Sequence, residues 1–307
     1  MKKSVKDKVV LITGASSGIG KAIAYELMLK GNRVYGTSRK AVAGNTSIYS
    51  DPAAYKDLMV TGDSISVQGT GNNSTINKNV GNSGFIEMVQ LDVRSEESVK
   101  NAVEYVMKKE GRIDILINNA GYGIAGAIED TTYEEAFSQF DTNFFGVMRV
   151  CRNVIPFMRR EGKGLIINIS SVAGVISIPF QSMYSASKFA LEAMSEALRI
   201  ELKPYGIKVV IIEPGDTNTG FTDNRIMVKG AEKGSVYFEK FKKSINKMIK
   251  DEKTGPGPET VAKVVAKISS KKNPPVRIAV GISYKLIVFL KRILPDKLVH
   301  FILAKIY

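Results

Sequence analysis

The stretch VVLITGASSGIG, residues 9–20, decides the fold of this 307-residue chain. Its apolar start predicts a buried strand, and Gly14, Gly18 and Gly20 follow before a helical pattern begins. Glycines permit a tight turn and let the backbone approach a pyrophosphate, whose charge a helix N-terminus stabilises. Three glycines alone are a weak signal, but a dinucleotide site requires this placement between a strand and a helix. We therefore expect a dinucleotide at this turn.

Apolar runs alternate with helical patterns along most of the chain, which predicts a parallel sheet covered by helices on both faces. The predicted strands are Val9–Thr13, Arg33–Thr37, Phe85–Leu91, Ile113–Asn118, Gly164–Ser170, Lys208–Glu213 and Val276–Val280. Helices are predicted near residues 19–30, 95–110, 132–160, 183–203 and 258–270. The fold class is thus α/β, a single-domain Rossmann-type doubly wound sheet of about seven strands, with ligands outside the carboxyl ends of the strands.

Two regions depart from this plan. The first is a polar insert at about 41–84, predicted to be a surface loop, with a short helix from Asp51-Pro52 through Met59. A lid or partner site is the alternative for the insert. The second is the apolar, basic C-terminal extension 281–307, expected to be helical. Residues 1–280 are predicted to form the catalytic domain, with a substrate-lid region at about 216–250.

Composition excludes several kinds of chemistry. Cys151 is the only cysteine and His300 the only histidine, so a disulfide, a thiolate zinc cluster, a histidine-based triad and a metal site are not expected. The net charge of +14 is not accompanied by a nucleic-acid motif, so no nucleic-acid partner is expected. The sequence has neither a signal-peptide pattern nor about 18 uninterrupted apolar residues, which predicts a cytoplasmic protein.

The end of the second predicted strand bears on the choice of cofactor. NAD enzymes place an acid there for the ribose 2′-hydroxyl, whereas a 2′-phosphate needs a cation. Here Ser38, Arg39 and Lys40 follow the strand without an acid. Arg39 can bind a phosphate through its planar guanidinium, and Ser38 can donate a hydroxyl. NADP(H) is therefore predicted, and the alternative is that Arg39 is only a loop charge.

Tyr184 and Lys188 are the candidate proton-transfer pair. They are four residues apart and share a helical face, where the ammonium should lower the phenol pKa from about 10 toward working pH. Such a tyrosine can act as a general acid or base. Tyr105 and Lys109 have the same spacing but are interpreted as an exposed pair without a role. What distinguishes the first pair is the small residues between its members and Ser171 upstream, which can hydrogen-bond a carbonyl oxygen.

Seven motifs then occur in order: Thr13-Gly14-xxx-Gly18-x-Gly20, Leu91-Asp92-Val93, Asn118-Asn119-Ala120-Gly121, Asn143, Ser171, Tyr184-xxx-Lys188 and Pro214-Gly215. On these motifs, residues 6–220 resemble a short-chain dehydrogenase/reductase of the compact, non-extended type. The tail Val276–Tyr307 is similar to those of 17β-hydroxysteroid and retinol dehydrogenases. It lacks the Asp-Gly-Gly ending of bacterial 3-oxoacyl carrier-protein reductases, and the insert is not typical of the family.

The resemblance implies a catalytic set of Asn143, Ser171, Tyr184 and Lys188. Tyr184 would pass a proton to the carbonyl oxygen, Lys188 would hold the nicotinamide ribose, Ser171 would orient the oxygen, and Asn143 would support a water. Asn118–Gly121 would also serve as a strand-ending turn. The implied cofactor contacts are Gly14, Ser16, Ser17, Gly18, Ile19, Gly20, Ser38, Arg39, Asp92, Val93, Asn119, Ala120, Gly121, Tyr184, Lys188, Pro214, Gly215, Thr217 and Thr219.

The predicted function is interconversion of a ketone and a secondary alcohol with NADP(H). A lipophilic substrate, namely a steroid, a retinoid or a long-chain keto lipid, would suit the apolar residues after Pro214. Packing between helices would explain these residues equally. They are Phe221, Met227, Tyr237, Phe238, Phe241 and Met248. The alternatives are a 3-oxoacyl thioester reductase and, from another class, a non-catalytic NADP(H)-binding regulator. A homo-oligomer, either a dimer or a tetramer, is also expected.

The C-terminal extension consists of two apolar, basic segments, Tyr284–Leu294 and Asp296–Ile306, separated by Pro295, which should break the helix. Three uses fit this pattern. The segments can cover a substrate pocket, form a subunit contact, or make a peripheral membrane contact through residues 284–307.

Overall fold

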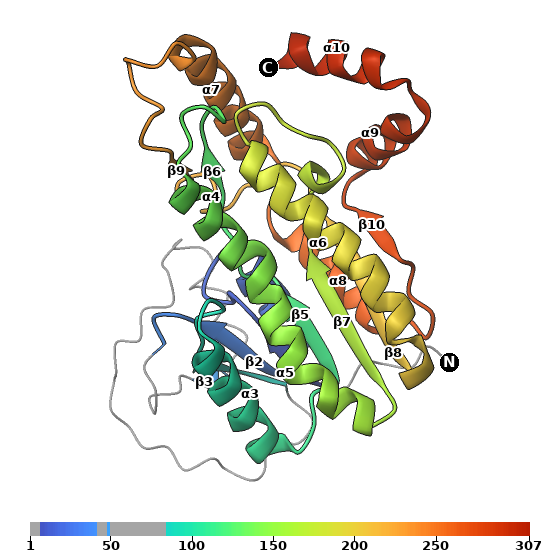
Figure 1. Ribbon diagram of the computed structural model, residues 1–307. Helices are drawn as coiled ribbons and strands as arrows, with labels where there is room; N and C mark the ends of the chain where they lie inside the picture. Colours follow the sequence, from blue (N-terminus) through green and yellow to red (C-terminus); the bar gives the residue numbers. More distant parts are fainter. Residues whose placement is uncertain (1–6, 42–47, 50–83) are drawn as a thin grey trace.

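The computed structural model describes residues 7–41, 84–307 and the backbone of 48–49 (Figure 1). Its central sheet has eight strands in the order β10-β8-β7-β5-β1-β2-β4-β3. Seven of them run parallel, and the two-residue β3 pairs antiparallel with β4 at one edge. The strands are β1 (Val9–Ile12), β2 (Arg33–Ser38), β3 (Ile48–Tyr49), β4 (Phe85–Gln90), β5 (Ile115–Asn118), β7 (Gly164–Ile169), β8 (Ile207–Glu213) and β10 (Arg277–Ala279). The predicted fold class and all seven predicted strands are confirmed.

The order of the strands reverses at β1, which lies between β2 and β5. In a doubly wound sheet this switch point opens a crevice at the carboxyl ends of the strands. The glycine turn lies there because it directly follows β1.

Each face of the sheet buries its own core. Val10 and Ile12 belong to one apolar cluster, and Val9 and Leu11 belong to the other, as the period of two in a strand requires. The first cluster is covered by α1 (Gly18–Leu29) and α8 (Glu259–Ser269). The second is covered by α3 (Glu96–Glu110), α5 (Gly146–Arg160) and α6 (Ser182–Glu201). A strand buried on both faces reads as a continuous apolar run, which explains VVLI in β1.

The helix predicted over 132–160 is not continuous. A capping box of Thr132 and Glu135 starts α4 (Tyr133–Phe140), and α5 carries the chain on from Gly146. Between them, Asp141–Phe145 form a π-helical turn. A π-helical turn adds one residue to a single turn of the helix, and this does not show in an apolar pattern of period 3.6. Such turns are common at functional sites.

Tyr105 and Lys109 on α3 also differ from the interpretation as an exposed pair without a role. The Tyr105 hydroxyl donates to the Glu87 carboxylate, and Lys109 Nζ lies 2.6 Å from Glu87 Oε2. Glu87 is fully buried on β4, so these two side chains provide the hydrogen bonds and countercharge that a buried carboxylate needs.

The carboxyl-end side of the sheet carries elements that the sequence did not predict. A short parallel ladder joins β6 (Ile124–Ala125) to β9 (Ile226–Met227), and α7 (Phe238–Thr254) follows. The tail forms α9 (Ile282–Ile293) and α10 (Asp296–Ile306), which end and begin around Pro295 as predicted. In Figure 1, α7, α9 and α10 gather beyond the carboxyl end of β7.

In the part of the chain that the structure describes, the helices are too short or too polar for any of them to cross a membrane. The short helix predicted from Asp51 and the loop predicted over most of the insert lie outside the described residues. The division into a catalytic domain and an extension stays a prediction.

Candidate active site

The glycine turn is held in shape by its own backbone and by Asn119. Gly14 and Gly18 have φ of 68° and 53°, in the left-handed region that favours glycine. A Cβ on Gly20 would lie 2.3 Å from the Gly14 carbonyl oxygen, so α1 can start this close only with glycine there. Asn119 Nδ2 donates to the carbonyl oxygens of Thr13 at 3.0 Å and Gly14 at 2.9 Å. The Asn119 side chain thus stabilises the turn, as a strand-ending motif would.

The first turn of α1 is suited to bind an anion. Within the described part of the chain, the Ser17 side chain makes no capping hydrogen bond, and the turn contains no acid. Its amide N–H groups and the positive end of the helix dipole therefore face the crevice without a competing carboxylate. Ser16 and Ile19 belong to the same turn, and Thr219 lies beside it, 3.4 Å from where a Cβ on Gly18 would be. These residues fit the pyrophosphate of a dinucleotide.

The carboxyl ends of β2 and β4 form a basic corner. Arg39 and Lys40 are exposed directly after Ser38, so the residues that follow β2 are basic and not acidic. The Asp92 carboxylate accepts a hydrogen bond from Arg94 Nη2 at 2.7 Å, and this bond, supported by the charge of Arg39, lowers the pKa of Asp92. Val93 is buried in the core. Arg94 was missed by sequence reasoning, although it directly follows a motif that the sequence identified.

Asn143 lies on the π-helical turn and is buried. Its Nδ2 donates to the Tyr122 carbonyl oxygen at 3.0 Å and to Ser187 Oγ at 3.2 Å, and its Oδ1 accepts from the Tyr122 amide at 3.1 Å. A Cβ on Gly121 would lie 3.1 Å from Asn143 Oδ1 and 3.8 Å from Lys188 Nζ. The π-helical turn therefore brings Asn143 to the same place as the lysine of α6.

Tyr184 is buried near the start of α6, and it forms a hydrogen bond with Ser171, which follows β7. Burial raises the pKa of Tyr184 to about 12, which outweighs the lowering by the Ser171 hydrogen bond and by the charge of Arg225. The predicted lowering of the Tyr184 pKa is therefore wrong for this structure. A phenol with this pKa stays protonated at neutral pH.

Lys188 lies one helical turn after Tyr184, with Nζ 5.8 Å from the centre of the tyrosine ring. Its Nζ donates to the Ile169 carbonyl oxygen at 3.0 Å. Burial lowers the pKa of Lys188 to about 8, against the opposing charge of Glu192. The ammonium is thus held at the end of β7 and remains charged below that pH.

A buried ion cluster behind Lys188 was not predicted. Glu192 lies one turn further along α6, and Glu213 ends β8. Arg277 Nη1 lies 3.4 Å from Glu192 Oε2 and 3.5 Å from Glu213 Oε1. Burial raises the pKa of Glu192 to about 7. The sequence signal would have been an acid four residues after a lysine, but the partners of Glu192 are too distant in sequence to be foreseen.

The loop after β8 connects the site to the tail. Pro214 accepts a hydrogen bond from the Val172 amide at 2.9 Å, next to Ser171, and Thr217 Oγ1 donates to the Gly215 carbonyl oxygen at 2.9 Å. Tyr284 of α9 packs on Gly215, where a Cβ would lie 2.2 Å from its ring. The Tyr284 hydroxyl also donates to Asp216 Oδ2 at 2.7 Å. One face of the tail therefore packs on the loop after β8, and the three predicted uses of the tail stay predictions.

The six apolar residues for which a substrate or helix packing was expected have different surroundings: Met227 is exposed, and Tyr237 and Phe238 are partly buried. Phe221 lies against Tyr184, with ring centres 5.6 Å apart. Phe241 and Met248 of α7 are buried in a small cluster with Ile245, which also contacts the C-terminal Tyr307. Packing between elements therefore explains the members on α7, and Phe221 faces the candidate proton donor.

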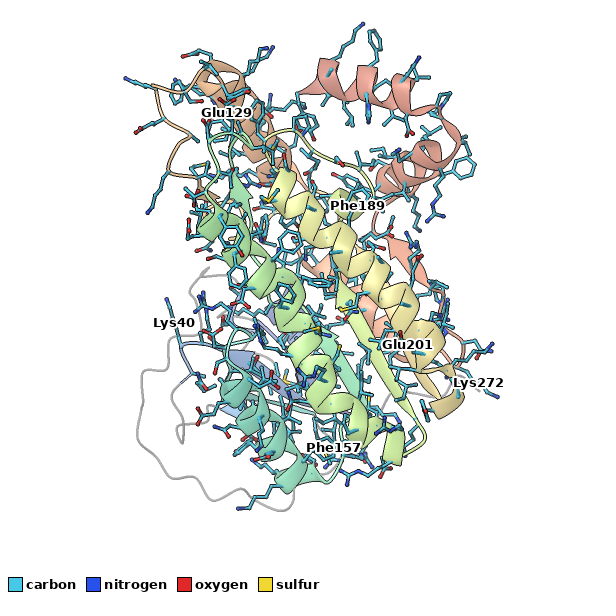
Figure 2. All side chains as sticks on the ribbon, in the orientation of Figure 1. Lys40, Glu129, Phe157, Phe189, Glu201 and Lys272 are labelled. Atoms are coloured by element: carbon cyan, nitrogen blue, oxygen red, sulfur yellow. The ribbon has the colours of Figure 1, made fainter. Side chains whose placement is uncertain are left out.

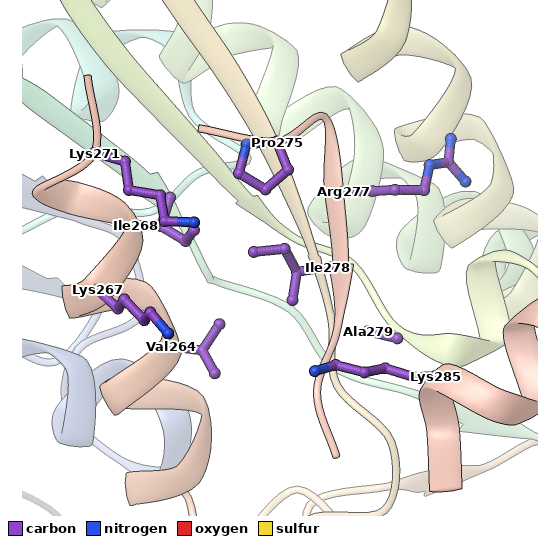
Figure 3. Close-up of a pocket in the computed structure, with 9 residues that line it drawn as sticks. All are labelled: Val264, Lys267, Ile268, Lys271, Pro275, Arg277, Ile278, Ala279 and Lys285. Atoms are coloured by element: carbon purple, nitrogen blue, oxygen red, sulfur yellow. The ribbon is translucent and has the colours of Figure 1, made fainter. Parts of the chain in front are cut away.

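A separate groove of about 450 Å³ lies at the free edge of β10 (Figure 3). It is lined by Val264, Lys267, Ile268, Lys271, Pro275, Arg277, Ile278, Ala279 and Lys285. None of these residues belongs to the predicted catalytic set, so this groove is distinct from the candidate active site.

A glycine turn at the switch point of a doubly wound sheet, together with a buried tyrosine, lysine and serine at the same edge, defines a class: nucleotide-binding oxidoreductases. The sequence pattern of the short chain dehydrogenase family matches residues 8–63 and 52–227. The chain belongs to the short-chain dehydrogenase/reductase family, so the predicted resemblance is confirmed.

Relatives match over nearly the whole chain. A 3-ketodihydrosphingosine reductase of Bacteroides thetaiotaomicron is 40% identical over 304 residues, covering 99% of both chains. Bovine retinol dehydrogenase 8 is 30% identical over 298 residues, covering 94% of this chain and 86% of its own. Among solved structures, a short-chain dehydrogenase of Streptomyces avermitilis is 32% identical with a TM-score of 0.71 and covers 92% of each chain. The match to the first relative includes the tail.

Proposed function

We propose that this oxidoreductase reduces the ketone of a long-chain lipid to a secondary alcohol with NADPH. The observation that carries the proposal is the buried Tyr184, which is hydrogen-bonded to Ser171 and followed one turn later by Lys188 at the edge of the sheet where the glycine turn lies. A protonated phenol beside a hydroxyl donor can hold a carbonyl oxygen from two sides.

The roles follow from the protonation states. Tyr184, with a pKa of about 12, starts protonated and donates its proton to the oxygen of the ketone. Ser171 positions that oxygen, and Lys188, charged below its pKa of about 8, stabilises the tyrosinate that results. Asn143 keeps the loop at Gly121 and Tyr122 in place through its hydrogen bonds. When bound, NADPH would supply the hydride to the carbonyl carbon.

NADP(H) is proposed over NAD(H) because of the corner at Arg39. A guanidinium there can pair with a 2′-phosphate, and Ser38 adds a hydroxyl. We expect Arg39→Ala to weaken NADPH binding by about ten- to a hundredfold, the worth of a charge-assisted hydrogen bond, and to leave NADH binding unchanged. Titration of both cofactors by fluorescence checks this. Equal losses for NADPH and NADH would instead indicate that Arg39 has no part in recognising the phosphate.

The name of the bacterial relative suggests 3-ketodihydrosphingosine as the lipid, a keto lipid of the kind that the sequence also favours. This molecule has an amine and a hydroxyl beside the ketone, followed by a long alkyl chain. Arg225 and Glu252 form an ion pair close enough to Tyr184 for both charges to affect its pKa. Among the described residues, Arg225 Nη1 is buried without a hydrogen-bond partner. The pair thus offers an acceptor for an ammonium and a donor for a hydroxyl.

The test is the initial rate of NADPH oxidation, and separately of NADH oxidation, with four carbonyl classes. These are 3-ketodihydrosphingosine, a steroid ketone, retinal and a 3-oxoacyl thioester. The expected result is that 3-ketodihydrosphingosine has the highest kcat/KM and that NADPH is preferred. A higher kcat/KM for the thioester would favour the alternative reductase, whereas tight NADPH binding without turnover of any of the four would favour the regulator. The oligomeric state, proposed to be a dimer or tetramer, is measured separately by light scattering.

A further inference from the structure

The outer faces of α9 and α10 carry two stripes of exposed apolar side chains. On α9 the stripe recurs at intervals of three and four residues, and on α10 at intervals of one, three and four, so each lies along one side of its helix. The members are between 39% and 87% exposed: Ile282, Leu286, Phe289 and Ile293 on α9, and Leu298, Phe301, Ile302 and Ile306 on α10. Figure 2 shows side chains of both helices projecting away from the rest of the protein.

The inner faces of α9 and α10, which together are called the α9–α10 hairpin, already provide the packing that holds these helices on the protein. Tyr284 and Val288 of α9 and Leu303 of α10 join a cluster with residues that follow β7. Val299 is buried, and Tyr307 packs on the apolar cluster of α7 that contains Phe241, Ile245 and Met248. The outer stripes are therefore not required for folding, and exposed apolar surface of this extent marks an interaction site.

Charge indicates which partner fits. Residues 282–307 contain five cations, Lys285, Lys291, Arg292, Lys297 and Lys305, against one acid, Asp296. Lys291 pairs with that acid at 2.7 Å, so the net charge of the segment comes from the other four. Two copies meeting through these faces would bring like charges together, which disfavours a subunit contact. An anionic lipid surface is complementary both to the cations and to the apolar stripes.

The dimensions set the orientation. Helices of 12 and 11 residues are about 18 Å and about 16 Å long, too short for a hydrocarbon core of about 30 Å. Pro295 separates them, so they cannot join into one longer helix. A helix with an apolar stripe flanked by lysine and arginine lies in the plane of the membrane interface.

We propose that the α9–α10 hairpin docks the enzyme on an anionic lipid bilayer, with the apolar stripes inserted in the interface and the cations at the headgroups. The inner faces of the two helices contact the loop at Gly215 and Asp216 and helix α7. The two helices therefore connect the docked bilayer to the loop after β8, beside the candidate active site. The docking itself does not depend on the proposed function. Only its use does: a lipid substrate would enter the site from the bilayer without passing through water.

The experiment is flotation of the full-length protein with vesicles of phosphatidylcholine, alone or mixed in equal parts with phosphatidylglycerol. The wild-type protein is expected to float with the mixed vesicles, and increasing the salt concentration should weaken this binding. The triple variant Leu286→Ser, Phe289→Ser, Phe301→Ser should bind about tenfold more weakly or worse, because three apolar insertions are lost. The matched control Leu29→Ser, Ile128→Ser, Val236→Ser removes three exposed apolar residues elsewhere and should bind as the wild type does.

A charge variant completes the design. Lys285→Glu with Lys297→Glu should weaken binding to the mixed vesicles by about tenfold or more, since each cation contributes about fivefold near an anionic surface. Thermal unfolding and NADPH binding establish that every variant is folded. The proposal is overturned if the wild type floats with neither vesicle, if the triple variant floats like the wild type, or if only the oligomeric state changes in the triple variant. Tyr184→Phe should float like the wild type, so failure of docking and failure of the proposed reaction are separate results.

Discussion

At the scale of single residues, the pairs Tyr184–Lys188 and Tyr105–Lys109 have the same spacing but different surroundings. Tyr184 and Lys188 are buried at the carboxyl end of the sheet, next to Ser171. Tyr105 and Lys109 lie at the surface and bind the buried carboxylate of an acid on β4. A spacing of four residues therefore specifies a shared helical face, and the tertiary structure decides whether that face does chemistry or satisfies a buried charge.

This contrast provides a matched test of the proton donor. Tyr184→Phe should lower kcat by about 10²- to 10⁴-fold, the usual worth of a general acid, with NADPH affinity unchanged. Tyr105→Phe should keep full activity and lose about 1 kcal/mol of stability, because a hydrogen bond to a buried group is removed. Steady-state kinetics and urea unfolding of both variants check this. Comparable kcat losses in the two variants would show that burial beside Ser171 is not what matters.

Glu192 should make stability depend on pH. Its pKa of about 7 in the folded protein lies above the ordinary value of 4.5, so the folded state keeps the proton longer than the unfolded state does. The stability associated with Glu192 is fully present below pH 4.5 and is lost as the pH rises through 7. Glu192→Gln should therefore be more stable than the wild type by on the order of 2 kcal/mol at pH 8, with a much smaller difference at pH 5.

The control for this prediction is Glu196→Gln. Glu196 also pairs with Arg277, but its side chain is half exposed. Urea unfolding at the two pH values should show no pH-dependent gain for this variant. If Glu192→Gln and wild type differed equally at pH 5 and pH 8, the raised pKa of Glu192 would be refuted.

Sequence reasoning at this scale places side chains correctly where their neighbours are local. Tyr184 and Lys188 share one helix, and Ser171 follows a strand that its apolar run predicts. The Arg277 cluster and the Arg225–Glu252 pair join residues far apart in sequence, and only the folded structure brings their charges together. The raised pKa of Tyr184 has the same origin, since burial is a property of the whole site.

At the scale of elements, the glycine turn was the most predictable part and the π-helical turn the least. Gly14 and Gly18 have positive φ, and Gly20 leaves no space for a Cβ, so the spacing of the glycines in the sequence already indicates the shape of the turn. The turn Asp141–Phe145 lies inside an otherwise regular helical pattern, and its extra residue leaves no mark in the apolar periodicity. Yet this turn places Asn143 against α6, so the position of a predicted site residue depends on an irregularity that a periodic pattern cannot report.

Gly20→Ala should disrupt the cofactor site. The new methyl group would lie 2.3 Å from the Gly14 carbonyl oxygen and 2.4 Å from Asn119 Nδ2, so the turn must open. We expect about tenfold weaker NADPH binding or worse and a stability loss of about 1–3 kcal/mol. Fluorescence titration and urea unfolding measure the two effects.

Gly162→Ala is the matched control for the glycine turn. Gly162 has a φ of 62° and no described atom within 4 Å of an added methyl group, so backbone strain of about 1–2 kcal/mol is the only expected cost. NADPH should bind to this variant as to the wild type. A weakening of NADPH binding by both substitutions alike would mean that general destabilisation, and not the shape of the turn, controls the cofactor site.

At the scale of the whole molecule, the tail packs beside the candidate active site. The sequence predicted a break at Pro295 and left three uses of the tail open, because amphipathic periodicity does not reveal which side meets the protein. The structure places Tyr284 on the loop that follows Pro214, and it places Tyr307 on α7. The tail therefore packs with one face on the loop after β8 and on α7, and it leaves the other face exposed.

Tyr284→Phe tests this connection. The change removes the hydrogen bonds to the Asp216 carboxylate and amide, at 2.7 Å and 3.0 Å, but keeps the ring on Gly215. We expect KM for the lipid to rise by about three- to tenfold with kcat nearly unchanged, because the loop at Asp216 loses its anchor while the proton donor is untouched. Tyr133→Phe, on an exposed ring of α4, should change neither constant. An unchanged KM in Tyr284→Phe would separate the tail from substrate binding.

The most direct test of the central claim follows the hydride itself. The protein is incubated with 3-ketodihydrosphingosine and NADPH that carries deuterium at C4 of the nicotinamide, using each C4 diastereomer in turn, and the product is analysed by mass spectrometry. One diastereomer should give an alcohol heavier by one mass unit, with the deuterium on the carbinol carbon, and Tyr184→Phe should form little product. An alcohol without deuterium from both diastereomers, or full product formation by Tyr184→Phe, would contradict the account.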